Sequence, residues 1–221
     1  MPEIITERKP RPRDQVVIRL SGGRFFALPQ AAAETLVVGQ ELSDEDVEHL
    51  DGIAQYVRGR DKAMRMLALR GRSKREVDDA LRALEIRDTI RTGIVRELEE
   101  SGLINDERFA REFVAVKKDV RRLGPHRLRQ DLARKGLSRA SVDAALSTFG
   151  VEEQEVMARA LVEKQLGTAA PTEKTLRRLV GMLRRKGYDY AVVNRVAYDL
   201  ARRIPHSLAA DEMVREDGAE E

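Results

Sequence analysis

The chain has no cysteine and no tryptophan, and aromatic residues make up only 4% of its 221 residues. Without cysteine it has neither disulfides nor thiolate chemistry, which suits a reducing compartment. No apolar run approaches the roughly 20 residues of a membrane span, and no secretory signal is apparent near the N-terminus. These absences predict a cytoplasmic protein without membrane contact.

Sequence signals for catalysis and cofactor binding are absent as well. His49, His126 and His206 lie far apart, without the spacing of a metal site or a nucleophile partner. Neither a Walker A sequence nor a G-x-G-x-x-G stretch occurs. We therefore expect a protein that is not an enzyme, that holds no cofactor or metal, and that works by binding other macromolecules.

Charge is abundant and segregated along the chain, although the formal net charge is only +3. Residues 41–55 carry six acidic residues and no Lys or Arg, a net −6, and residues 205–221 carry six against one, a net −5. Residues 111–140 carry ten Lys or Arg against three acidic residues, a net +7, and residues 171–187 carry six against one, a net +5. Such segregation creates strong local fields, which predicts charged binding surfaces.

The N-terminal 42 residues are expected to lie outside the helical part of the chain. Residues 1–13 hold three of the seven prolines and mixed charges, which indicates a disordered arm. Residues 14–42 read as a small β-hairpin extension with Gly22-Gly23 as its two-residue turn. A short Val37-Val38 run is compatible with a third strand.

The turn fixes the expected register of this hairpin. A two-residue loop pairs Leu20 with Phe25 and Ile18 with Ala27. Because strand side chains alternate, both pairs and Val16 would then share the buried face. An isolated hairpin is marginal in water, so the hairpin is expected to pack on another element.

From Ser43 to about residue 204 the apolar spacing predicts about nine helices. A motif recurs three times among them: Leu, then Gly four residues later, then a capping residue two further on, then Val after four more. The three copies are Leu67, Gly71, Ser73, Val77; Leu132, Gly136, Ser138, Val142; and Leu183, Gly187, Asp189, Val193. Each glycine is expected to end a helix in a left-handed conformation, and each polar residue is expected to cap the next helix.

The pattern therefore predicts an all-α fold, an elongated tandem array of three three-helix repeats, with the small N-terminal β-hairpin extension. The repeats are expected at residues 43–87, at 88–150 (a linking helix and the second repeat) and at 151–204. Residues 205–221 are expected to form a disordered acidic tail.

Two stretches carry a family resemblance: residues 102–110, GLINDERFA, and residues 124–137, GPHRLRQDLARKGL. With Arg70, Ser73, Val77, Leu81 and residues 183–188, they resemble the RecX family of bacterial RecA regulators over about residues 60–203. Asp131, where Glu is commoner in the family, is a mild departure. Only some members have an N-terminal extension comparable with residues 14–42.

The resemblance implies a fold and a function. RecX proteins are modular, bind within the groove of RecA–DNA filaments, inhibit the ATPase and strand exchange of RecA, and favour filament disassembly. The resemblance thus implies a monomeric inhibitor of RecA that acts in DNA repair and homologous recombination. Its partner would be the RecA nucleoprotein filament, with the DNA phosphate backbone as a second contact.

Basic residues of the two positive segments are the candidate contacts with the filament or DNA, because carboxylates nearby are too scarce to pair with all of them. A solvated helix face is the alternative interpretation. The candidates are Lys117, Lys118, Arg121, Arg122, Arg127, Arg134, Lys135, Arg177, Arg184 and Arg185.

Two other classes of protein fit parts of the pattern. A helix–turn–helix DNA-binding protein or transcriptional regulator would use a basic three-helix unit in the major groove, although three tandem copies with different exposed residues argue against it. A plain α-solenoid scaffold is the other alternative.

Overall fold

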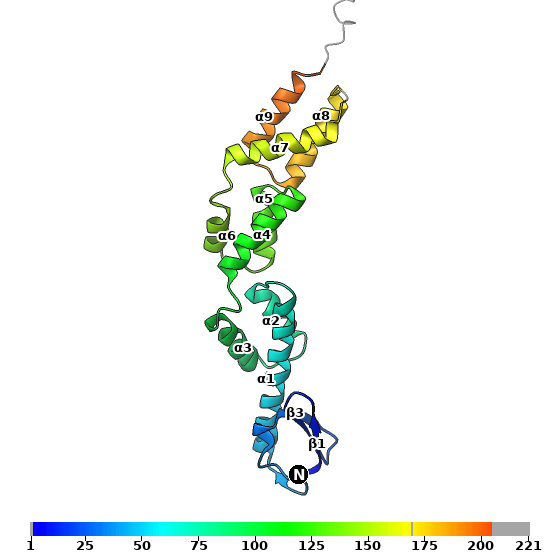
Figure 1. The fold of residues 1–221 in the computed structure, drawn as a ribbon, viewed down its shortest axis with the longest axis vertical. Coiled ribbons are helices and arrows are strands. Elements are labelled where there is room, and N and C mark those ends of the chain that lie inside the picture. The colour runs from blue at the N-terminus through cyan, green and yellow to red at the C-terminus, as the bar shows by residue number, and fades with distance from the viewer. Residues whose placement is uncertain (1, 169, 205–221) are drawn as a thin grey trace, which may run out of the picture. The chain divides into compact units, whose positions relative to one another are not determined.

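The computed structural model describes residues 2–168 and 170–204, and the chain divides into two compact units, Met1–Phe109 and Ala110–Glu221 (Figure 1). The predicted acidic tail therefore lies outside the described residues.

The first unit begins with strands β1 (Glu3–Arg11), β2 (Gln15–Leu20) and β3 (Phe25–Pro29), the short 3-10 helix η1 (Ala31–Ala33), and strand β4 (Glu41–Leu42). The helices are α1 (Asp44–Leu69), α2 (Lys74–Arg82), α3 (Asp88–Glu100), α4 (Asp106–Arg121), α5 (Pro125–Arg134), α6 (Arg139–Leu146), α7 (Val151–Leu166), α8 (Glu173–Lys186) and α9 (Tyr190–Ala201).

The N-terminal strands form one antiparallel sheet in the order β3-β2-β1-β4. The prediction of a disordered arm over residues 1–13 is wrong for β1, which pairs with β2 from Arg11↔Gln15 to Ile5↔Leu20. Prolines and charges in this stretch suggested an arm because only Ile5 of β1 is buried. A strand paired on both sides needs few apolar residues of its own, since its neighbours supply the hydrogen bonds.

The predicted hairpin register is wrong by one residue. Leu20 donates its N–H to the Arg24 carbonyl at 2.9 Å, so three residues form the loop, and Gly23 has φ +84°. A three-residue loop that ends in a left-handed glycine is the second common way to close a hairpin. Phe26 consequently takes the buried position expected for Phe25, whose side chain is 61% exposed.

The sheet packs on the first half of α1, as expected for a hairpin that needs a partner. Val47 and Leu50 of α1 belong to the same buried cluster as the inward-facing residues of β1, β2 and β3, and Ile53 and Ala54 pack against it. The suggested strand at Val37-Val38 is not formed, because both side chains are 60% exposed and the strand that follows is β4.

Helices α1, α2 and α3 pack on one another within the first unit. Ile94 and Leu98 of α3 lie in the same buried cluster as Val77 and Leu81 of α2 and Ala63 of α1. The boundary predicted after residue 87, which made α3 a linking helix, is therefore corrected: α3 completes the first repeat. The amphipathic stripe of α3 was visible in the sequence, but its partner was not.

A partly buried ion pair also joins α3 to α2. Arg91, in α3, is only 7% exposed, and its guanidinium donates to Asp78 of α2 at 2.5 Å and to Asp88 at 2.7 Å. The two carboxylates satisfy a charge that would otherwise be costly to bury.

The turn glycines follow the predicted pattern in two of the three copies. Gly136 and Gly187 have φ +82° and +83°, as expected for left-handed helix ends. The first copy differs, because α1 ends at Leu69 and the chain continues extended at Arg70, with φ −168°. Arg70 instead donates to the Gly71 carbonyl at 2.8 Å and pairs with Glu76, the residue that completes the capping box before α2.

The second unit contains α5 packed on α6, and α7, α8 and α9 packed on one another. Ser138 caps α6 by accepting from the Ser141 N–H at 3.1 Å, as predicted. Among the described residues no helix is long and apolar enough to cross a membrane.

Candidate macromolecule-binding surface

All ten candidate basic residues lie in the second unit, on α4, α5, α8 and the segments that directly follow α4 and α5. Their environments differ, and the differences separate residues that stabilise the fold from residues that are free to bind.

Four of the ten have carboxylate partners. Lys118 reaches Glu153 at 2.7 Å, Arg177 reaches Glu173 at 3.0 Å, and Arg127 and Arg134 both reach Asp131 at 3.3 Å. For these residues the ion pairs favour the solvated-face interpretation, because a partner elsewhere would have to replace an existing carboxylate.

Two further candidates pack on an aromatic ring. The ammonium groups of Lys117 and Lys135 lie 5.5 and 5.7 Å from the centre of the Phe113 ring. Lys118 likewise lies 5.3 Å from the Phe149 ring. The Lys117 contact lies within α4, the Lys135 contact joins the end of α5 to α4, and all three contacts reduce the availability of these lysines.

The remaining four candidates are exposed arginines that make no ion pair with any residue of the described chain: Arg121, Arg122, Arg184 and Arg185. They come from two places far apart in the sequence, the C-terminal end of α4 and the C-terminal end of α8. We call these four residues the basic junction.

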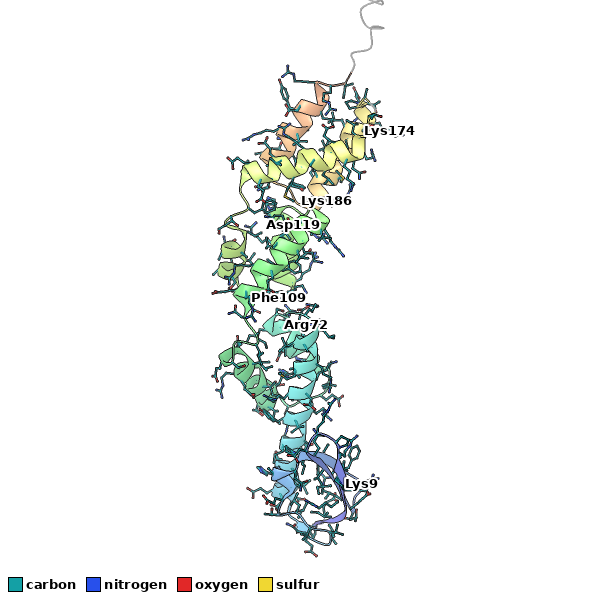
Figure 2. The ribbon with its side chains drawn as sticks, viewed as in Figure 1. Lys9, Arg72, Phe109, Asp119, Lys174 and Lys186 are labelled. Atoms are coloured by element: carbon teal, nitrogen blue, oxygen red, sulfur yellow. The ribbon has the colours of Figure 1, made fainter. Side chains whose placement is uncertain are left out.

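Hydrogen bonds bring the two halves of the basic junction together. The Lys186 ammonium, at the end of α8, donates to the Arg121 carbonyl at 2.6 Å, and the Tyr188 hydroxyl donates to the Arg122 carbonyl at 3.1 Å (Figure 2, where Lys186 is labelled). Arg122 has φ +51°, an uncommon conformation for a side-chain-bearing residue. The bond from Tyr188 therefore helps to fix a loop that the local sequence does not favour.

Backbone contacts join the same two segments. The N–H of Gly124 donates to the Lys186 carbonyl at 2.9 Å, and the N–H of His126 donates to the Gly187 carbonyl at 3.0 Å. The backbones approach so closely that a Cβ on Gly124 would lie 2.3 Å from the Gly187 carbonyl oxygen. A Cβ on Gly187 would in turn lie 2.3 Å from the Arg127 nitrogen. Glycine is required at both positions, and the loop after α4 is held firmly against the turn after α8.

Burial shifts the pKa values of both side chains that make this contact. Burial raises the pKa of Tyr188 to about 12, so its hydroxyl is a hydrogen-bond donor at neutral pH. Burial also lowers the pKa of Lys186, because the charged ammonium loses water there.

Asp189 does not cap α9 through its side chain, contrary to the prediction. Its carboxylate accepts from the Gln154 amide at 2.7 Å and lies 3.0 Å from His126 Nε2. Gln154, which is buried, also accepts from the Asp189 N–H at 3.1 Å. Asp189 thus ties α7 and the start of α5 to the turn after α8, and His126 has a structural partner.

Sequence reasoning missed the residues that build the junction. Gly187 was expected only to end its own helix, and Gly124 and Tyr188 entered the sequence analysis only as parts of the stretches that carry the family resemblance. The signal for their contact is weak, because nothing in the local sequence of Gly124 shows that another backbone approaches it. Within the described residues there is no group of three or more His, Asp or Glu side chains that could hold a metal ion.

These observations define a class: a helical-repeat protein in which the second and third three-helix repeats are locked together and present an unpaired basic surface. Family models match two parts of the chain: the second three-helix domain of RecX at residues 105–146, and the third at residues 152–197. The regulatory protein RecX of Streptomyces lividans is 38% identical over 135 residues, which cover 60% of this chain and 72% of the relative. That of Thermobifida fusca is 32% identical over 143 residues, which cover 64% and 77%.

The chain belongs to the RecX family. Solved structures share its fold. A crystal structure of regulatory protein RecX superposes with a TM-score of 0.65 at 21% identity, over 88% of this chain and 98% of the other. RecX from Lactobacillus salivarius superposes with a TM-score of 0.60 at 23% identity, over 66% and 97%. The family identifies the protein as a regulatory protein.

Proposed function

We propose that this protein regulates RecA by binding the RecA–DNA filament, and that the basic junction makes part of the contact. Binding inhibits the ATPase and strand exchange of RecA and favours filament disassembly. Family membership supports the regulatory role, and the four unpaired arginines support the surface. The single observation that carries the proposal is that the helix ends which bear these arginines meet, while none of the four makes an ion pair within residues 2–168 and 170–204.

The chemistry of arginine suits both candidate ligands on a filament. A guanidinium binds carboxylates and phosphates through two parallel hydrogen bonds, and unpaired guanidinium groups lose no existing partner on binding. A rigid support adds affinity, because less side-chain and loop freedom is lost when the complex forms. The hydrogen bonds from Lys186 and Tyr188 provide that support by fixing the loop that carries Arg121 and Arg122.

The alternative of a helix–turn–helix DNA reader is less well supported. Major-groove readers expose free polar side chains along a recognition helix. On α5 two arginines share Asp131, and on α8 Arg177 pairs with Glu173. The free arginines among the ten candidates are instead at helix ends, a position that suits contacts with phosphate or with an acidic protein surface.

The test titrates the purified full-length protein into a RecA ATPase assay on single-stranded DNA. Wild type is expected to inhibit, and a variant with Arg121, Arg122, Arg184 and Arg185 all replaced by Gln is expected to inhibit at least about tenfold less potently, about 1.4 kcal/mol in binding. A matched control replaces four exposed arginines that already have carboxylate partners, and it loses the same formal charge. These are Arg75, Arg82, Arg96 and Arg139.

The control is expected to inhibit nearly as well as wild type. Circular dichroism of each variant checks that the helices are intact. If wild type does not inhibit, the regulatory proposal for RecA is wrong. If wild type and the junction variant inhibit equally, only the assignment of the surface is wrong.

A further inference from the structure

A second basic surface lies in the first unit, on the β-sheet and beside it. Outward-facing residues of β1, β2 and β3 form a shallow hollow of about 310 Å³, and a cleft of about 650 Å³ separates β3 from α1. We call the hollow and the cleft together the N-terminal platform. Its characteristic residues are Lys9, Arg11, Arg19, Phe25 and Arg65.

Phe25 is the aromatic centre of the platform. It lines both the hollow and the cleft, its side chain is 61% exposed, and the Arg19 guanidinium lies 6.0 Å from the centre of its ring. The three-residue hairpin loop is what turns this ring outward, since the alternative register would bury it. The exposed ring leaves apolar surface in contact with water. Stacking of another flat ring on it would bury that surface and lower the free energy.

Cations surround this ring in excess. The side chains that line the hollow and the cleft include six Lys or Arg against three acidic residues. Arg19 pairs with Glu7 and Arg24 pairs with Glu3, but Lys9, Arg11 and Arg65 make no ion pair within the described part of the chain.

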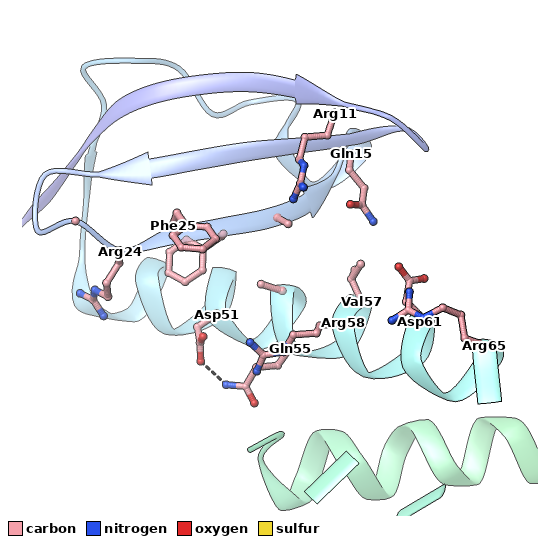
Figure 3. A pocket seen from close by; sticks show the side chains of 14 residues that line it. Arg11, Gln15, Arg24, Phe25, Asp51, Gln55, Val57, Arg58, Asp61 and Arg65 are labelled. Atoms are coloured by element: carbon pink, nitrogen blue, oxygen red, sulfur yellow. Dashed lines mark hydrogen bonds between the residues drawn. The ribbon is translucent and has the colours of Figure 1, made fainter. Parts of the chain in front are cut away.

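The cleft brings Arg11 and Arg65 together from two elements, and Lys9 lines the adjoining hollow. Arg11 and Gln15 point from the sheet toward α1, on the side where Asp61 and Arg65 rise from the helix (Figure 3). Of the two carboxylates that α1 adds to the cleft, Asp51 is already engaged, because it accepts from the Gln55 amide at 2.5 Å and lies 3.5 Å from Arg87. Asp61 alone is left to offset Lys9, Arg11 and Arg65. The free charge of the platform is therefore positive.

We propose that the N-terminal platform binds single-stranded nucleic acid, with one base stacked on Phe25 and the neighbouring phosphates held by Lys9, Arg11 and Arg65. Exposed aromatic rings flanked by unpaired cations are the common device of single-strand binding surfaces. The ring selects single strands, because the face of a base in a duplex is covered by its neighbours. This inference does not depend on the proposed contact with RecA, since it concerns a different unit and different residues.

The test measures the affinity of the full-length protein for two fluorescein-labelled DNA probes of about 16 nucleotides. One is oligodeoxythymidine, and the other has the same sugar–phosphate backbone with abasic sites in place of every base. Wild type is expected to prefer the probe with bases, and Phe25→Ala is expected to bind that probe at least about fivefold more weakly, with unchanged affinity for the abasic probe. Lys9→Gln with Arg11→Gln is expected to weaken binding of both probes.

Tyr198→Ala is the matched control, because Tyr198 is also an exposed ring, with the Arg202 guanidinium 5.9 Å from its centre. It is expected to retain the preference for bases. The proposal is overturned if wild type binds both probes equally, or if Phe25→Ala retains the preference. It is also overturned if Phe25→Ala weakens only the inhibition of RecA, because the platform would then be a protein contact. Absence of RecA inhibition by wild type would leave this inference standing.

Discussion

At the scale of single residues, two glycines are required for different physical reasons. Gly136 has φ +82°, a conformation that disfavours every residue with a Cβ. Gly124 has φ −82° and ψ 169°, which any residue can adopt, yet a Cβ there would overlap the backbone of Gly187. The first requirement is local and can be predicted from helix-end patterns, whereas the second depends on a segment 63 positions away, between Gly124 and Gly187.

Replacing Gly124 by Ala is therefore expected to destabilise the protein more than replacing Gly136 by Ala. The Gly136→Ala change costs the left-handed strain, on the order of 1–2 kcal/mol. Gly124→Ala must separate two backbones and stretch the bonds from Gly124 to Lys186 and from His126 to Gly187, so we expect about 2–4 kcal/mol. Thermal unfolding of both variants shows which substitution destabilises the protein more. A smaller loss for Gly124→Ala would mean that the close contact with Gly187 is not required.

Capping residues were the most predictable single positions. The predicted caps Ser73 and Ser138 each accept from a backbone N–H three residues further on, and Ser43 and Asn105 do the same. This succeeds because a cap is satisfied within four residues of sequence. Asp189 shows the limit of such reasoning, since its carboxylate has a competing partner in Gln154, 35 residues away.

At the scale of elements, helices were predicted well and the sheet poorly. Apolar residues at helical spacing identified the buried faces of α3 and α8, because a helix shows its pattern within itself. Strand β1 has only one buried side chain, Ile5, and owes its structure to pairing with β2 and β4. The hairpin register likewise depended on a choice between two- and three-residue loops that the Gly22-Gly23 pair does not settle.

The shared core of the sheet and α1 changes what truncation should do. From the sequence, a chain beginning at Ser43 would be expected to fold as well as the full protein. In the structure, removal of the sheet would expose Val47 and Leu50 of α1 to water, and burial of each side chain contributes about 1.5–3 kcal/mol to stability. We therefore expect the truncated chain to lose helical circular dichroism from the first half of α1 and to bind a hydrophobic dye.

The control is Val38→Ser in the full-length chain, which changes an exposed residue of the removed segment and should leave both signals unchanged. Retention of full helicity by the truncated chain, together with cooperative unfolding and no dye binding, would show that the sheet is a dispensable extension.

At the scale of the whole molecule, the sequence located the basic segments but not the free charges within them. Whether a cation is neutralised depends on which carboxylate the fold brings near, as Glu153 is brought to Lys118 and Glu163 to Arg203. Ion pairing and ring contacts account for six of the ten candidates and leave the four arginines of the basic junction. A count of charges along the chain cannot make this distinction for Lys118, whose partner lies 35 residues away. The carboxylate partners of Arg127, Arg134 and Arg177 are only three or four residues away, so helical spacing could have identified those pairs.

The dependence of filament binding on salt should reveal what these four arginines contact. Each phosphate contact releases condensed counterions, which contributes about 0.9 to the slope of log affinity against log salt concentration on duplex DNA and about 0.7 on single strands. Pairs with carboxylates of a protein surface release no such layer and are only screened. Replacing all four arginines by Gln is therefore expected to flatten the slope by about 3 if they bind phosphate, and by much less if they bind RecA. In both cases the deficit relative to wild type is largest at low salt, where screening is weakest.

Binding of wild type and variants to preformed RecA filaments, followed by fluorescence anisotropy at several salt concentrations, measures these slopes. The control variant, which lacks four ion-paired arginines, should run parallel to wild type, because each of those cations already has a carboxylate close by. Parallel lines for wild type and the junction variant, with equal affinity at every salt concentration, would exclude the basic junction from the contact.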